Sequence, residues 1–190
     1  MSKSYFECSL PELQAEVAAI GRETETLFGP LTGAQLNWKP GAEIWSVAQC
    51  LEHVLIVNRA MLKPLHAIAQ GRKQPKLLER VPLLPKLVAW MMAKSMSPQS
   101  TQKFKAPVAM TPSASTLDAQ IVKEYGAHQR ELMSCFQALD KSDLVSVVMV
   151  SPLMNLMTYS VLDACRIIVA HERRHMAQAQ RIIQTVGFPQ

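Results

Sequence analysis

Apolar residues recur at intervals of three and four along several stretches of the chain, which is the spacing of one helix face. The first stretch is predicted to begin in the capping box Ser9-Leu10-Pro11-Glu12 and to end at Gly29-Pro30. A second capping box, Ser46-Val47-Ala48-Gln49, opens a helix that ends near Gly71. Pro64 lies inside this second helix, where we expect a kink or a break.

Two more helices are predicted in the second half of the chain. One runs from about residue 116 to 139, and the other begins at Ser160-Val161-Leu162-Asp163 and ends before Gly187. The segment Leu144 to Val150 is β-branched and could be extended, but it has no obvious strand partner. The apolar stripe of the third helix consists of Ile121, Tyr125, His128, Leu132, Cys135 and Leu139.

The connections between these helices are long. Residues 29–45 form a predicted loop that carries Trp38 and Trp45, and residues 97–115 form another. Residues 81–97 are strongly apolar, and we expect a short helix near 83–96 that covers the bundle or contacts a partner. Four long helices joined by long connections predict an all-α fold, a four-helix bundle in a single domain over residues 1–190.

Composition narrows the class of protein. The chain is 48% hydrophobic and 18% charged, which is typical of a folded globular domain. The net charge is +5, but the basic residues are scattered and lack interleaved aromatics, so we expect no nucleic-acid partner. We expect no signal peptide and no membrane span. The four cysteines lie far apart and form no CxxC motif, which favours reduced thiols in the cytoplasm.

The most informative motif is His171-Glu172-Arg173-Arg174-His175 in the last predicted helix. Two histidines four residues apart lie one turn apart on the same face, so both can reach one metal ion. Their stripe is otherwise apolar except for Gln178, so the pair faces the core. Two core histidines with ordinary hydrogen bonds are the alternative. A metal ion is the favoured partner, because burial keeps imidazole neutral and neutral imidazole is a good ligand.

The same five residues match H-E-x-x-H, the signature of zinc peptidases. Such enzymes take a third metal ligand from further along the chain. Only 15 residues follow His175, and none of them is His, Asp or Glu. A sheet that could hold an extended peptide is not predicted before the helix either. The sequence therefore argues against a peptidase, despite the match.

A third ligand must come from upstream of the pair. His53 lies two turns into the second helix, one helical step from its apolar stripe, and is the best candidate. His128 is a rival, because it lies on the stripe of the third helix, although a core histidine that donates to a carbonyl or hydroxyl is the favoured interpretation there. His66 follows Pro64 near a helix end, where we expect it to be exposed.

Three segments together resemble the DinB family of small helical-bundle proteins, which includes YfiT-type metal-dependent hydrolases. The first is Asn37-Trp38-Lys39-Pro40 followed by Trp45-Ser46-Val47-Ala48-Gln49-Cys50-Leu51-Glu52-His53, a tryptophan-serine entry into a histidine-bearing helix. The second is Phe104-Lys105-Ala106-Pro107, and the third is the H-x-x-x-H motif with Gln178. The three segments span residues 37 to about 180.

The resemblance implies an up-down-down-up bundle and a divalent metal ion, nickel or zinc, held by His53, His171 and His175. It also implies thiol-dependent transfer, in which a low-molecular-weight thiol serves as cosubstrate. Three histidines leave a coordination position open, as in catalytic zinc sites. Glu172 points about 100° away from His171 around the helix, and we expect it to be a surface carboxylate.

Three functional hypotheses remain open. The first is a metal-dependent transferase or hydrolase acting on a small molecule. The second is a metal-binding bundle without catalysis, and the third is a protein-interaction module whose histidines are structural. Arg174 is expected to be solvated, and Trp38 and Trp45 either wall the pocket or staple the helix entry. Because the 81–97 segment is apolar, we expect a homodimer.

Overall fold

The computed structural model describes residues 4–72, 110–113, 116–139, 143–154 and 157–190. Four long helices dominate these residues: α1 (Leu10–Phe28), α3 (Val47–Ala69), α5 (Ile121–Leu139) and α6 (Val161–Ile183). The shorter elements are η1 (Tyr5–Glu7), α2 (Gly33–Asn37), β1 (Val148–Val150) and β2 (Thr158–Ser160). The predicted helix near 83–96 lies outside the described residues, and homodimer formation stays a prediction.

Side-chain caps fix where the helices begin. Ser46 Oγ accepts a hydrogen bond from the Gln49 backbone N–H, and Gln49 Oε1 accepts one from the Ser46 N–H, both at 3.2 Å. Ser9 and Glu12 form the same reciprocal box before α1. These caps satisfy N–H groups that the first turn of a helix leaves unpaired. Both predicted capping boxes are therefore confirmed, and the second one sets the start of the helix that carries His53.

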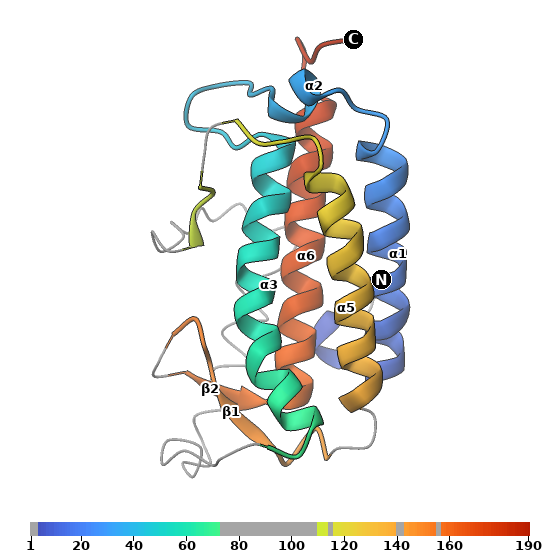
Figure 1. Ribbon diagram of the computed structural model, residues 1–190, viewed down its shortest axis with the longest axis vertical. Coiled ribbons are helices and arrows are strands. Elements are labelled where there is room, and N and C mark those ends of the chain that lie inside the picture. Colours follow the sequence, from blue (N-terminus) through green and yellow to red (C-terminus); the bar gives the residue numbers. More distant parts are fainter. Residues whose placement is uncertain (1–3, 73–109, 114–115, 140–142, 155–156) are drawn as a thin grey trace.

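The four long helices run up, down, down and up, as predicted (Figure 1). α1 packs against α5 and α6, and α3 packs against the same two helices. Thus α5 and α6 lie on one diagonal of the bundle, while α3 and α6 are antiparallel neighbours. The all-α bundle predicted from the periodicity is confirmed, with one small antiparallel hairpin added at the lower end.

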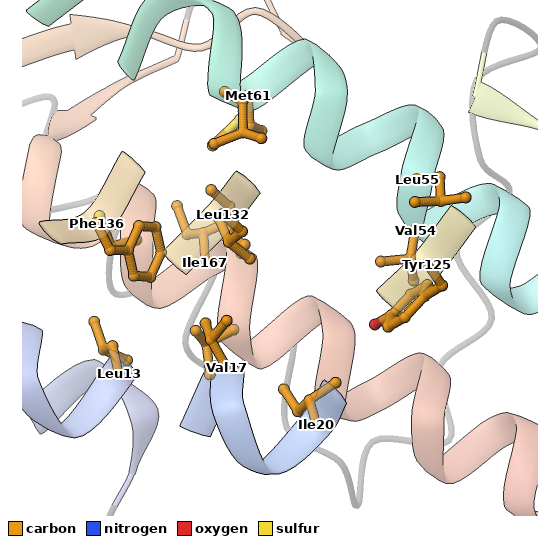
Figure 2. Packing of buried hydrophobic residues seen from close by; sticks show 14 of the residues in the cluster. Leu13, Val17, Ile20, Val54, Leu55, Met61, Tyr125, Leu132, Phe136 and Ile167 are labelled. Atoms are coloured by element: carbon orange, nitrogen blue, oxygen red, sulfur yellow. The ribbon is translucent and has the colours of Figure 1, made fainter. Parts of the chain in front are cut away.

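The hydrophobic core fills the space between the four helices. Side chains from every long helix point toward this common interior, including Val17, Met61, Leu132 and Ile167 (Figure 2). All seven apolar positions that define one face of α3 are buried: Val47, Cys50, Val54, Val57, Met61, Leu65 and Ile68. The four cysteines are buried and unbridged. Burial of these stripes is what holds the helices in their relative positions.

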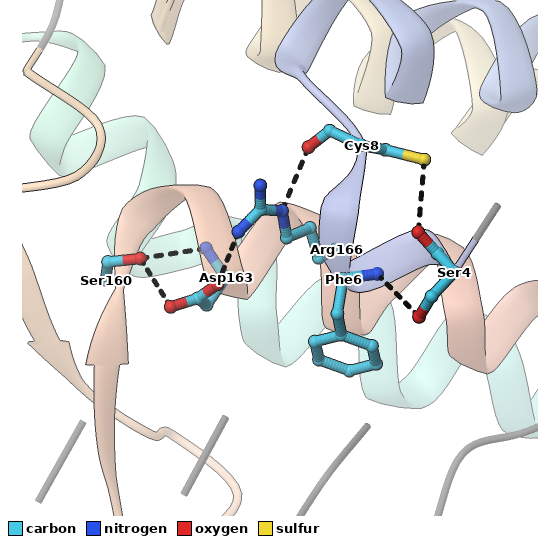
Figure 3. A network of polar contacts seen from close by, with 6 residues as sticks. All are labelled: Ser4, Phe6, Cys8, Ser160, Asp163 and Arg166. Atoms are coloured by element: carbon cyan, nitrogen blue, oxygen red, sulfur yellow. Dashed lines mark hydrogen bonds and ion pairs between the residues drawn. The ribbon is translucent and has the colours of Figure 1, made fainter. Parts of the chain in front are cut away.

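The start of α6 is tied to the N-terminal segment. Ser160 Oγ caps α6 by accepting from the Asp163 N–H at 3.0 Å, and Arg166 pairs with Asp163 at 3.0 Å (Figure 3). Arg166 Nε also donates to the Cys8 carbonyl at 2.9 Å, just before α1 begins. These contacts connect the two parallel helices α1 and α6 at one end of the bundle.

Three local expectations need comment. α3 continues through Pro64 to Ala69, which excludes a break there and leaves the expected kink as a prediction; residues on both sides of the proline are buried in the same core. The segment around Val148 does find a strand partner, because Val148–Val150 pairs antiparallel with Thr158–Ser160. The predicted loop over 29–45 contains the short helix α2, which is capped by Thr32. The two missed elements are each only a few residues long, too short for periodicity to reveal.

The core packing predicts a large difference between two apolar truncations. Leu132 is completely buried, so Leu132→Ala should lower the free energy of unfolding by about 2–5 kcal/mol. Val186 is 99% exposed, and Val186→Ala should change it by less than about 0.5 kcal/mol. Urea unfolding followed by circular dichroism measures both. Equal losses in the two variants would contradict the packing described here.

Candidate metal centre

Three histidines meet between α3 and α6. His171 and His175 lie one turn apart in the middle of α6, and His53 projects from the second turn of the neighbouring helix α3. One potential ligand atom from each residue lies within 4.8 Å of the other two. The Nε2 atoms of His53 and His171 are 3.2 Å apart. The structure thus brings together the three histidines singled out from the sequence.

In His53 and His175, a hydrogen bond at Nδ1 determines which ring nitrogen carries the proton. His53 Nδ1 lies 2.6 Å from the Met110 carbonyl oxygen, which can only accept, so this nitrogen carries the proton. His175 Nδ1 lies 3.0 Å from Gln178 Oε1 and donates to it in the same way. Each ring therefore keeps a lone pair on Nε2. Outer partners of this kind are typical of metal-binding histidines.

His171 is in a different situation. Because His53 Nε2 has only a lone pair, His171 Nε2–H must donate to it across the 3.2 Å contact. His171 Nδ1 then remains buried without a hydrogen-bond partner among the described residues. An unpaired buried polar atom costs on the order of 1–3 kcal/mol. The free imidazole of His171 therefore has one ring nitrogen in contact with His53 and one that is unpaired among the described residues.

The environment keeps all three imidazoles neutral. Burial lowers the pKa of His53, and burial with the neighbouring His175 and His53 lowers the pKa of His171 well below its usual value. Burial, His53 and Arg174 lower the pKa of His175 to about 3. Neutral imidazoles are the protonation state that binds zinc, nickel or copper. The donor set and its protonation state fit a divalent transition-metal ion.

Trp45 covers one side of the histidine cluster. Its ring centroid lies 4.9 Å from that of His53 and 6.0 Å from that of His175, with the indole nearly parallel to the second ring. His53 and His171 are buried, whereas His175 and Trp45 are half-buried. The cluster is consequently closed toward the core and reaches the surface beside His175. Of the two predicted pocket walls, Trp45 lies at the site, while Trp38 packs on Phe188.

Glu172 is not a surface carboxylate, and this expectation was wrong. The side chain is completely buried, and its Oε1 accepts hydrogen bonds from Asn58 Nδ2 at 2.7 Å and Gln129 Nε2 at 2.6 Å. Burial raises the pKa of this carboxyl to about 7. It turns away from the histidines toward α3 and α5, so it does not occupy the position of a peptidase general base.

The neighbouring charged residues also differ from expectation. Arg173 binds α1 through Glu16 at 2.8 Å and Glu23 at 2.6 Å. Arg174 is half-buried rather than fully solvated, and its charge helps to lower the pKa of both His171 and His175. The carboxylate of Glu52, next to His53, accepts hydrogen bonds from the Ser113 N–H and hydroxyl. Among the residues that the structure describes, the cluster therefore contains three imidazoles and no carboxylate.

The other two described candidate histidines lie elsewhere. His128 is buried on α5, but its nearest charged partner is Glu131, at 3.6 Å from Nδ1. His66 is partly exposed and lies 3.5 Å from the other carboxylate oxygen of Glu131. Neither joins the three-histidine cluster. A cavity of about 190 Å³ between α3 and α5, lined by Leu55, Arg59 and Glu124 among others, is also separate from it.

Comparison with known protein families gives a match over most of the chain. The family model described as the DinB superfamily matches residues 17–179. That range includes all three histidines and the four long helices except the ends of α1 and α6. The curated proteins and the solved structures compared with the chain contain no match. In the described part of the chain, no helix is long and apolar enough to cross a membrane.

The lowered pKa of His175 predicts how stability depends on pH in the metal-free protein. An unfolded histidine titrates near pH 6.5, whereas His175 in the fold has a pKa of about 3. Between these values the unfolded chain binds more protons, so stability is lost as the pH falls from about 6.5 toward 3. From pH 6.5 to 4, His175 should account for a loss on the order of 3 kcal/mol.

Urea unfolding in a chelator, at pH 6.5 and at pH 4, measures this dependence. His175→Gln removes the titrating group, so it should lose less stability than the wild type over the same interval. Glu172 acts in the opposite direction between about pH 4.5 and 7, because burial raises its pKa, and this contribution is common to both proteins. An equal loss in the two proteins would show that His175 is not buried in its neutral form.

Proposed function

Because the chain belongs to the DinB superfamily, and because three neutral imidazoles converge between α3 and α6, we propose that it is a divalent-metal-dependent enzyme. In this proposal His53, His171 and His175 hold one zinc or nickel ion. The reaction is transfer to or from a low-molecular-weight thiol, or hydrolysis of a small molecule. The observation that carries the proposal is the pair of outer hydrogen bonds that leave Nε2 lone pairs on His53 and His175.

The donor set supports a catalytic rather than a structural ion. Structural zinc sites usually have four protein ligands, whereas catalytic sites have three and leave a position open. Among the described residues, only the three histidines form a group that could hold a metal ion. The side chain of His175 is half-buried, so the cluster lies near the surface. When bound, the ion lowers the pKa of a water or thiol at the open position, so that a nucleophile exists near neutral pH.

The residues of the chain supply the surroundings for this chemistry. Trp45 excludes water from one side of the His53 and His175 rings. Arg174 lies close enough to the cluster for its positive charge to lower the pKa of His171 and His175, and the same charge favours an anionic ligand such as a thiolate. The Met110 carbonyl and Gln178 hold two imidazoles in a fixed orientation. These features suit a small anionic or thiol-bearing substrate.

The proposal predicts one divalent ion per chain in protein purified without a nickel column. His53→Ala, His171→Ala and His175→Ala should each lose this ion, since each removes one of three ligands. His128→Ala is the matched control, because it removes a buried histidine outside the cluster and should retain the ion. Metal analysis by mass spectrometry gives the stoichiometry. Wild-type protein that is folded and does not take up zinc or nickel would refute the metal site.

The open position can be tested separately from metal binding. Cobalt-loaded protein titrated with a low-molecular-weight thiol should develop the near-ultraviolet absorption of a sulfur-to-cobalt bond. The band should saturate at one thiol per ion, and an alcohol of the same size should not produce it. If the cobalt ion binds but its spectrum is insensitive to thiols, the transferase assignment fails, and the non-catalytic metal-binding alternative gains support.

A further inference from the structure

The buried carboxyl of Glu172 has no role in the proposed metal chemistry and is costly to bury. It lies on α6 between the two histidines of the cluster, and its side chain is completely inaccessible to solvent. Its Oε1 accepts from Asn58 on α3 and from Gln129 on α5, at 2.7 and 2.6 Å. One oxygen atom of α6 is thus bound by two other helices at once.

The position of this carboxyl follows from the packing of the bundle. α6 is a neighbour of α3 but is diagonal to α5. A side chain of α6 that contacts both helices must lie near the bundle axis. Glu172 therefore reaches the axis, while His171, the preceding residue, faces His53 on α3. The two side chains leave α6 about 100° apart, so the orientation of one determines the orientation of the other.

The network is not optimised for stability. Among the described residues, Glu172 Oε2, Asn58 Oδ1 and Gln129 Oε1 are buried without a hydrogen-bond partner. The Tyr125 hydroxyl approaches the carboxyl but also lacks a partner of normal geometry. Apolar side chains of similar volume in place of all three residues would remove these unpaired groups. Hydrogen bonds are directional, however, whereas apolar contacts are not. The network can therefore define the rotation of α6 about its axis and its register along α3.

We propose that Glu172 is a positioning residue for the three-histidine cluster. Its bonds to Asn58 and Gln129 set the rotation of α6 about its own axis and its register along α3, so that His171 and His175 face His53. The consequence for metal binding rests on the proposed function, but the alignment of the histidines does not. Arg173 holds α6 to α1 through Glu16 and Glu23, which are 33% and 40% exposed, so that contact is the weaker constraint.

Two substitutions separate positioning from stability. Glu172→Gln keeps an oxygen that can accept from Asn58 and Gln129, whereas Glu172→Met keeps the length and removes the acceptor. In metal-free protein, nuclear Overhauser contacts between the His53 and His171 rings, whose centroids lie 5.1 Å apart, report their alignment. We expect Glu172→Gln to retain these contacts and Glu172→Met to lose them, with zinc affinity reduced about 10–100-fold.

A stability control completes the experiment. Val17→Ala truncates a buried residue of α1, away from the network, and should lower the melting temperature without changing the ring contacts or the zinc affinity. If Glu172→Met does not fold, Asn58→Leu removes the bond to α3 alone and should also lose the ring contacts. Ring contacts and affinity unchanged in the folded variants would overturn the positioning role. If Glu172→Met loses the ring contacts but the wild-type protein binds no metal, the positioning role is supported and the proposed function is refuted.

Discussion

Burial of the apolar stripes holds the bundle together, but the central turn of α6, residues 171–175, is polar and contacts all three other long helices. Buried polar groups must find partners, because leaving them unpaired costs free energy. His171 contacts α3, Glu172 contacts α3 and α5, and Arg173 contacts α1. One turn of α6 thus contacts each of the other three long helices. The same turn supplies two of the three histidines, so the packing constraint and the candidate metal centre are inseparable.

This constraint explains why a match to the peptidase signature does not make a peptidase site. The signature requires its glutamate to reach the reacting centre beside the metal. Here the glutamate is directed to the bundle axis, and two amides bind it there. The two histidines have the same spacing as in the peptidase signature, but here the third histidine of the cluster comes from α3. Spacing along one helix specifies which residues share a face, but the neighbouring helices decide what each face contacts.

Much of the fold is readable from the sequence because its signals are local. Capping boxes at Ser9 and Ser46 and the regular apolar stripes specify where the helices begin and which faces are buried. His53 was a candidate on the same grounds, since it lies one step from the stripe of α3. These signals act within a few residues, so one chain is enough to detect them.

The remaining features depend on contacts between distant segments. Glu172 lies outside the main stripe of α6, but this helix is buried on more than one side, as completely buried Val169 also shows. Periodicity therefore underestimated the width of its buried face. The Met110 carbonyl that orients His53 comes from a connection with no side-chain signal. The partner strand Thr158–Ser160 is too short to be detected without its neighbour. Each of these three features can be recognised only once the bundle is assembled.

In the proposed site, three imidazoles of this chain hold one ion and leave a coordination position open. X-ray absorption spectroscopy of zinc-loaded protein measures how many histidines bind the ion. We expect three histidine nitrogens at about 2.0–2.1 Å and one further light atom from solvent, with the histidine signal reduced in His53→Ala. A coordination shell that contains sulfur in the absence of added thiol, or only two histidines in the wild type, would contradict the three-histidine centre.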